Sequence, residues 1–465
     1  MKKKINITYL MFNLYIILLY YITQNHNNLA FVCSFYLGML IYNIFSNIDI
    51  TYILEKYRNK FKVYKIIIGF ITLLFTLLSI ISYYAGSIIP IENLGIINLL
   101  SIIFFLTIII MKITGALLKN INYKKIGNKL FDIYLVFIII VSSSSSLFLY
   151  KVFNLNDNIR IILLYLINII AFIVAFLLLY ILILRKSKMV VKEKYNYKEI
   201  FKHSIEGNKT LTLYNIINES YIYTSIIIIF YILTNKYNYS YENINIIITN
   251  IYFYGIFLIK YIKYLLKKHL ELDSDKFSIQ IVKKSGCIIS ICILLMVISG
   301  PICKIIFNTN NFLFDLILLL FFYTLYDYTM HTSIKFNNNK INKVSLLIGL
   351  IIKLVFEIPL INTSYRIGNS LAFGSIISII LGMIISTIIS MIFINKKLKI
   401  NILYKFSDIL NIIYENIILC LILVLFTLIV NVDTEGIVSS ILVIIFYVFI
   451  TLLFYFVKRL LKKKE

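Results

Sequence analysis

The chain has 465 residues, of which 60% are hydrophobic and only 14% are charged, and its formal net charge is +25. Soluble domains average about 45–50% apolar and about 25% charged residues, so the composition excludes a soluble globular protein. It also argues against a nucleic-acid partner, because no basic stretch is long enough to build a folded basic surface.

Apolar runs long enough to cross a bilayer, roughly 20 residues each, recur along the whole sequence. The expected fold class is an all-α integral membrane protein with about 14 transmembrane helices. These helices are predicted near residues 8–24, 29–54, 62–86, 93–118, 129–150, 160–184, 204–234, 241–265, 282–306, 311–334, 344–362, 367–395, 406–431 and 436–457. The first run has no small-residue cleavage site after it, so we interpret it as a helix and not as a signal peptide.

The positive charges predict the orientation of these helices. Thirty-eight of the 46 Lys and Arg residues lie in eight short stretches, which alternate with nearly neutral loops between the apolar runs. Basic loops stay in the cytoplasm because cations are costly to move across a membrane. Both termini are therefore predicted to be cytoplasmic and the number of helices to be even, and the short outer loops leave no room for an external enzyme module.

The polar segment 185–203 separates six predicted helices from eight. A weak repeat relates loops about 215 residues apart in the same orientation, as in parallel-repeat transporters. The expected organisation is an N-lobe of six helices at 1–184, a cytoplasmic linker at 185–203, a C-lobe of six helices at 204–395, and two further helices with a basic tail at 396–465.

Three passages of the sequence carry a resemblance to a known family. Residues 344–399 have an apolar-Pro-apolar step at Pro359, an outer turn containing Gly368 and a basic end, and residues 286–308 and 49–56 are the other two passages. These passages resemble, respectively, the C-terminal pattern, the ninth helix and the end of the second helix of the multidrug/oligosaccharidyl-lipid/polysaccharide (MOP) exporter superfamily. With fourteen predicted helices, the chain is nearer the polysaccharide and lipid-linked oligosaccharide flippases than the twelve-helix drug antiporters.

The resemblance implies two lobes in a V that alternate between inward and outward openings, with two added C-terminal helices. The implied activity is transport of a polyprenyl-pyrophosphate-linked oligosaccharide across the bacterial cytoplasmic membrane, and not an enzymatic reaction. The expected partners are this lipid-linked sugar, membrane lipids and, as further candidates, a polysaccharide polymerase or glycosyltransferases. No cofactor is expected. No metal site is expected either, because the five cysteines have no metal-ligand spacing.

Polar residues inside predicted helices are the candidate site residues, because they are costly in a bilayer. Thr212, Asn215 and Glu219 recur at helical spacing and form one polar face, with Asn43 and Asn47 as further cavity candidates on the second helix. Such a face could form hydrogen bonds with sugar hydroxyls, or it could pack against another helix.

Two pairs of ionisable residues at i,i+4 spacing lie deep in predicted helices. Lys353 and Glu357 could form a closed ion pair, or Lys353 could attract the pyrophosphate of a substrate as a point charge. Asp327 and His331 could relay protons as coupling residues, or form a structural hydrogen bond.

Two other functions remain open from the sequence. The first is a cation-coupled multidrug antiporter of the same superfamily. The second, an integral-membrane glycosyltransferase or polysaccharide polymerase, is disfavoured because such enzymes need catalytic residues on substantial outer loops.

Overall fold

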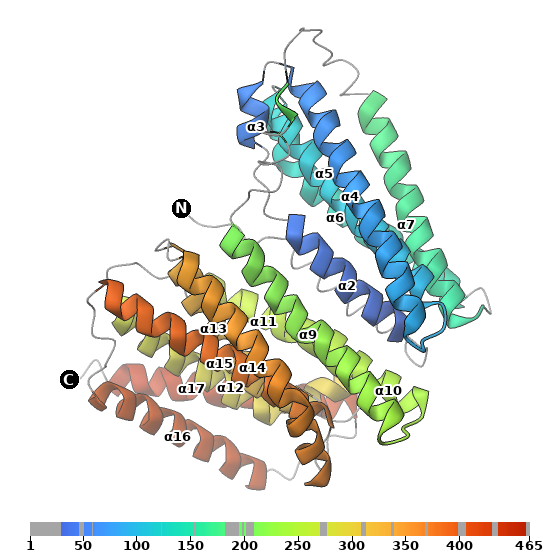
Figure 1. Ribbon diagram of the computed structural model, residues 1–465. Helices are drawn as coiled ribbons and strands as arrows, with labels where there is room; N and C mark the ends of the chain where they lie inside the picture. The colour runs from blue at the N-terminus through green and yellow to red at the C-terminus, as the bar shows by residue number, and fades with distance from the viewer. Residues whose placement is uncertain are drawn as a thin grey trace. The chain divides into compact units, whose positions relative to one another are not determined.

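The computed structural model describes residues 29–45, 51–57, 59–121, 123–151, 155–181, 195–197, 200, 209–269, 277–307, 313–335, 339–367, 371–398, 406–429 and 436–461. Every regular element in these ranges is a helix, and they contain no β-strand (Figure 1). The predicted all-α class is confirmed.

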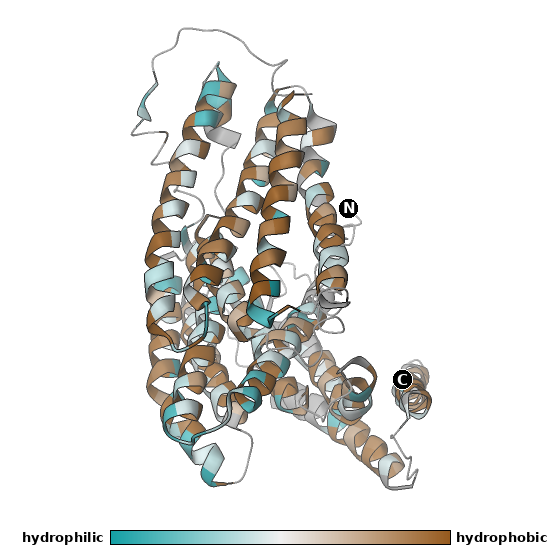
Figure 2. Cartoon of the chain, turned by 90° about the vertical axis from the view of Figure 1, so that its right-hand side faces the viewer, coloured by the Kyte–Doolittle hydropathy of each residue, from teal (hydrophilic) through white to brown (hydrophobic). Residues whose placement is uncertain are grey.

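Most of these helices have the length and hydropathy of membrane spans. Ten are long and apolar enough to cross a bilayer, and three shorter apolar helices accompany them at Leu29–Phe45, Ile133–Leu149 and Tyr414–Thr427. Apolar residues run along much of the length of the helices in Figure 2. Together these helices match the predicted spans from residue 29 onward, whereas the predicted first span, 8–24, lies outside the described residues. The chain is a multi-pass membrane protein.

The chain divides into two compact units, Met1–Thr249 and Asn250–Glu465. The first contains α2 (Leu29–Phe45), α3 (Thr51–Lys56), α4 (Lys60–Ile88), α5 (Leu94–Asn120), α6 (Lys124–Lys151), α7 (Asp157–Leu179), α9 (Lys209–Asn235) and α10 (Tyr241–Ile247). The lobes expected at 1–184 and 204–395 stay a prediction.

Helix α5 is the core of the first unit and packs against α2, α4, α6 and α7, while α9 packs against α2. Hydrogen bonds from hydroxyl groups link these helices. They matter because lipid tails are as apolar as the helix surfaces, so the hydrophobic effect gives little driving force for helix association. Among the bonds between helices are Tyr64–Thr114 (2.8 Å), Tyr134–Thr107 (3.0 Å), Ser142–Asn168 (2.6 Å) and the Ser101 hydroxyl to the Ser34 carbonyl (2.8 Å).

The π-helix η3 (Ile248–Gly255) leads into the second unit, which continues with α11 (Ile256–His269), α12 (Phe277–Phe307), α13 (Leu313–Lys335), α14 (Asn339–Arg366), α15 (Leu371–Leu398), α16 (Phe406–Ile429) and α17 (Ile437–Leu461). Helix α12 packs against α13, α16 and α17, and α13 packs against α11 and α15. The two C-terminal helices are therefore anchored mainly through α12.

Helices α14 and α15 form the most extensive helix pair of the second unit. Small buried residues recur every fourth position along α15, namely Gly374, Ser378, Gly382, Ser386 and Ser390. Such stripes let two membrane helices approach closely. The Ser386 hydroxyl donates to the Ser345 carbonyl oxygen at 3.0 Å, and the Ser390 and Ser345 hydroxyls lie 3.0 Å apart. At the closest point, a Cβ added at Gly374 would lie 2.4 Å from the Leu360 carbonyl oxygen.

We predict that Gly374→Ala lowers the stability of the purified protein by about 1–3 kcal/mol, because the new methyl group meets backbone that cannot move aside freely. Gly69→Ala is the matched control, since a Cβ at Gly69 meets nothing within 4 Å. It should be neutral or stabilising by about 0.5–1 kcal/mol, because alanine favours the helix. Thermal unfolding in detergent measures both variants, and equal losses of stability would contradict the close approach.

Candidate functional site

One face of α14 is buried along the helix, and it is unusually polar. Its buried polar or small residues are Asn342, Ser345, Gly349, Lys353, Glu357 and Ser364. The opposite face exposes apolar side chains such as Leu354, Val355 and Ile358. Because α14 packs chiefly on α15, the sequence pattern places the polar stripe in that interface and the apolar face toward lipid.

Lys353 and Glu357 form an ion pair at the centre of this stripe. The ammonium group of Lys353 donates to Oε2 of Glu357 at 2.6 Å, and both side chains are 0% exposed. The hydroxyl of Ser375 on α15 donates to the other carboxylate oxygen, Oε1, at 2.7 Å. Burying an ion costs several kcal/mol, so each charge requires the other and the serine hydroxyl strengthens the arrangement. Of the two arrangements that the sequence left open, the structure has the closed pair.

A third element reaches this pair from η3. Tyr252 is fully buried and lies near Ser375 and Glu357. The charged pair is shielded by the packing of α14 on α15. An anionic ligand can bind Lys353 only by displacing Glu357, so the site is closed in this conformation.

A second charged cluster joins α11 and α13. Nε2 of His331 lies 3.5 Å from Oδ1 of Asp327, as the i,i+4 spacing predicted. The ammonium group of Lys263 on α11 lies 3.4 Å from the same oxygen and 3.7 Å from the ring centroid of Tyr323. Asp327 therefore has two basic partners, and His331 is the most exposed side chain of the three.

The polar face of α9 has a buried part and a half-buried part. Asn218 and Glu219 are 6% and 7% exposed, whereas Thr212 and Asn215 are half-buried. The side-chain oxygen of Asn218 has no hydrogen-bond donor among the described residues. Buried polar atoms without partners are rare in native proteins and call for an explanation, for which a ligand is one candidate.

Of the two cavity candidates on the second predicted helix, only one lies among the described residues. Asn43 is half-buried on α2, the helix that packs against α9. Asn47 lies outside the described residues.

The structure brings together the predicted partners within each i,i+4 pair and adds residues that sequence reasoning missed. Ser375, Tyr252 and Lys263 come from other helices, and nothing in the linear sequence links them to Glu357 or Asp327. Lys263 lies in a run of basic residues that topology alone explains. No signal in the sequence marks the π-helix.

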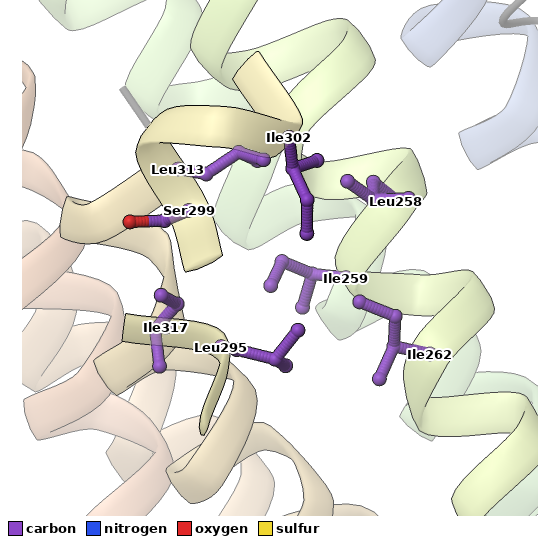
Figure 3. Close-up of a pocket in the computed structure, with 8 residues that line it drawn as sticks. All are labelled: Leu258, Ile259, Ile262, Leu295, Ser299, Ile302, Leu313 and Ile317. Atoms are coloured by element: carbon purple, nitrogen blue, oxygen red, sulfur yellow. The ribbon is translucent and has the colours of Figure 1, made fainter. Parts of the chain in front are cut away.

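Figure 3 shows a pocket in the second unit, where aliphatic side chains of α11, α12 and α13 converge. Its only polar side chain is Ser299, whose hydroxyl donates to the carbonyl oxygen of Met296 at 2.8 Å. The pocket offers no free polar group and no charge, so its chemistry does not suit a sugar or a phosphate.

Within the described ranges, no three His, Cys, Asp or Glu side chains are placed to hold a metal ion. The five cysteines are free thiols.

No protein-family model matches this sequence, and no curated protein matches it. The fold does have counterparts among solved structures. The lipid II flippase MurJ, in an inward closed conformation, aligns with a TM-score of 0.61 and 15% identity over 98% of both chains. The chain has the fold of the MOP superfamily. A multidrug resistance MATE family transporter of that superfamily, in an outward-facing conformation, aligns with a TM-score of 0.52 and 11% identity over 85% of this chain and 96% of its own. The resemblance predicted from the sequence is thus confirmed for the fold.

We predict that Lys353→Met destabilises the protein by about 3–5 kcal/mol, because it leaves the Glu357 carboxylate buried without a countercharge. The double variant Lys353→Met/Glu357→Gln should recover most of this loss, since both charges are gone. Unfolding in detergent of the wild type, Lys353→Met, Glu357→Gln and the double variant completes a double-mutant cycle.

Lys458→Met is the control, because the Lys458–Glu415 pair is 26% and 33% exposed. Solvent screens such a pair, so the expected loss is about 0–1 kcal/mol. Equal instability of the single and double Lys353 variants would contradict the coupled burial of the pair.

Proposed function

We propose that the protein is a membrane transporter that moves a polyprenyl-pyrophosphate-linked oligosaccharide across the bacterial cytoplasmic membrane by alternating access. The observation that carries the proposal is the likeness to the lipid II flippase, which extends over 98% of both chains. The likeness to the multidrug transporter extends over less of this chain. Helices α16 and α17 agree with the fourteen-helix plan of the flippases that the sequence resembles.

The charged groups of the second unit support an anionic substrate. In our proposal Lys353 exchanges Glu357 for the pyrophosphate when the α14–α15 interface opens. A pyrophosphate replaces the lost carboxylate with a charge-assisted contact, so the ammonium group is not left uncompensated. The closed pair is then the resting state of the site.

The polar face of α9 supports a sugar ligand. Thr212, Asn215 and Glu219 offer donors and acceptors that match sugar hydroxyls, and Asn218 adds a carbonyl oxygen without a donor. We assign this face, with Asn43 and Asn47, to the oligosaccharide. The membrane lipids, a polymerase and glycosyltransferases are the expected partners.

A cation-coupled multidrug antiporter is the second candidate, and the Asp327–His331 cluster is the observation that favours it. A carboxylate beside a histidine can couple proton movement to transport. In the flippase, the same residues would couple the ion gradient to lipid movement. An integral-membrane glycosyltransferase is less well supported, because the connections between helices on the predicted outer side are short, as between Ile88 and Leu94.

We predict that Glu219→Ala lowers export of a lipid-linked oligosaccharide by about tenfold to a hundredfold, because it removes a charged hydrogen-bond acceptor. Export is measured as outer-leaflet oligosaccharide in cells that depend on this gene, with the membrane level of the protein as the folding control. Glu415→Ala, at a partly exposed carboxylate, should export normally. Normal export by Glu219→Ala at normal membrane level removes Glu219 from the site.

Lys353→Ala should also impair export, and the double variant Lys353→Met/Glu357→Gln separates binding from stability. The double variant should fold, because no charge is left unpaired, yet export about tenfold less or worse, because the pyrophosphate has lost its cation. Wild-type export by the double variant would mean that the pair is only structural.

A further inference from the structure

Glu357 has no second cation to bind if a ligand takes Lys353 from it. Among the described residues, Lys353 is the only cation within ion-pair distance of its carboxylate. The next cation toward the C-terminal end of α14 is Arg366, which lies nine residues on and thus about 14 Å along the helix axis. Helix α15, the main partner of α14, has no charged residue from Leu371 to Asn395. A carboxylate that leaves Lys353 therefore stays without a countercharge.

Glu357 is also shielded from water. Its side chain is 0% exposed, and a Cβ added at Gly374 of α15 would lie 2.4 Å from the carbonyl oxygen of Leu360, three residues beyond Glu357. Ser375 donates to Oε1, whereas Lys353 donates to Oε2. The serine hydroxyl can thus keep its bond when Lys353 leaves, but one neutral donor does not balance a negative charge. A buried carboxylate in such surroundings takes up a proton.

A phosphate on Lys353 gives a second reason for this proton. Nζ of Lys353 lies 2.6 Å from Oε2 of Glu357, so a ligand oxygen that accepts from this ammonium group comes close to the same carboxylate. Two anionic groups so close together in a buried site do not both stay ionised. Once Oε2 carries a proton, it becomes an O–H donor that binds the ligand oxygen instead of repelling it.

Titratable groups on the neighbouring elements do not replace the lost cation. Asp327 and His331 of α13 contact each other, and Asp327 also contacts Lys263 of α11. Element η3 brings Tyr252 near Glu357, and a phenol carries no positive charge. The remaining charged residues of α13 lie near its two ends, at Asp315 and Lys335. A proton is therefore what neutralises Glu357.

We propose that Glu357 is the proton-binding residue of the anion site, and that its Oε2 takes up one proton when a phosphate oxygen replaces it on Lys353. The proton comes from the water that enters with the ligand, and it forms the O–H bond of Oε2. Ser375 keeps its bond to Oε1. Release of the ligand returns the carboxylate to Lys353 and the proton to water. The inference rests on the proposed function and deepens it, because it makes anion binding at this site dependent on protons.

Infrared spectroscopy of the full-length protein in lipid nanodiscs tests the proton acceptor without a substrate, because a protonated carboxyl group has a carbonyl stretch that a carboxylate lacks. Lys353→Met leaves Glu357 without its cation. At about pH 7, its spectrum should show one protonated carboxyl band that Lys353→Met/Glu357→Gln and the wild type lack. Asp327→Asn, added to Lys353→Met, is the control and should keep the band. A folded Lys353→Met protein without the band would overturn the proposal.

The stability of the same variant gives a second readout. Folded Lys353→Met holds a proton on Glu357 that the unfolded chain has released, so its stability should fall as the pH rises. Relative to the wild type, its unfolding equilibrium constant should increase up to about tenfold per pH unit between about pH 5 and pH 7. The double variant Lys353→Met/Glu357→Gln should show no such change, and equal pH dependence of the two variants contradicts proton uptake at Glu357.

The wild type with inorganic pyrophosphate tests the coupled step even if Lys353→Met does not fold. Saturating pyrophosphate should produce the protonated carboxyl band, and calorimetry should detect binding that Lys353→Met/Glu357→Gln loses. Binding that depends on Lys353 but produces no band would overturn the proton uptake and leave the proposed anion site standing. Absence of binding that depends on Lys353 would overturn both.

Discussion

The buried ion pair between Lys353 and Glu357 is the interaction on which the second unit depends. Two charges at 0% exposure in a membrane helix are tolerated only if they meet each other and if the neighbouring helix supplies further donors. This requirement explains why α15 presents Ser375 and a stripe of small residues to α14, and why its backbone approaches Leu360 so closely at Gly374. It also explains why the exposed side chains of α14 can all be apolar from Val344 to Pro359.

Different kinds of interaction hold the helices together within each of the two units. In the first, single hydroxyl bonds such as Tyr64–Thr114 and Tyr134–Thr107 fix neighbouring helices around α5. In the second, charge is concentrated in two clusters, Lys353–Glu357 and Lys263–Asp327–His331.

Hydropathy and charge were sufficient to predict the membrane fold, because each span must bury its own backbone and each span is local in sequence. The contacts within Lys353–Glu357 and Asp327–His331 were predictable for the same reason, since they lie one turn apart on one helix. Ser375, Tyr252 and Lys263 were not, because tertiary packing alone brings them to these pairs. The π-helix was missed because no residue pattern in the sequence marks its wider turn.

The central claim is that the protein transports an anionic lipid-linked sugar that binds Lys353, whose ammonium group is paired with Glu357 in the resting state. The most direct measurement is translocation by the purified protein in proteoliposomes that contain a polyprenyl-pyrophosphate oligosaccharide, with an impermeant lectin or glycosidase reporting the sugar that reaches the other leaflet. The account predicts transfer that requires the protein and is lost in Lys353→Met/Glu357→Gln. Transfer of organic cations in exchange for protons, with no movement of the lipid-linked sugar, would contradict it.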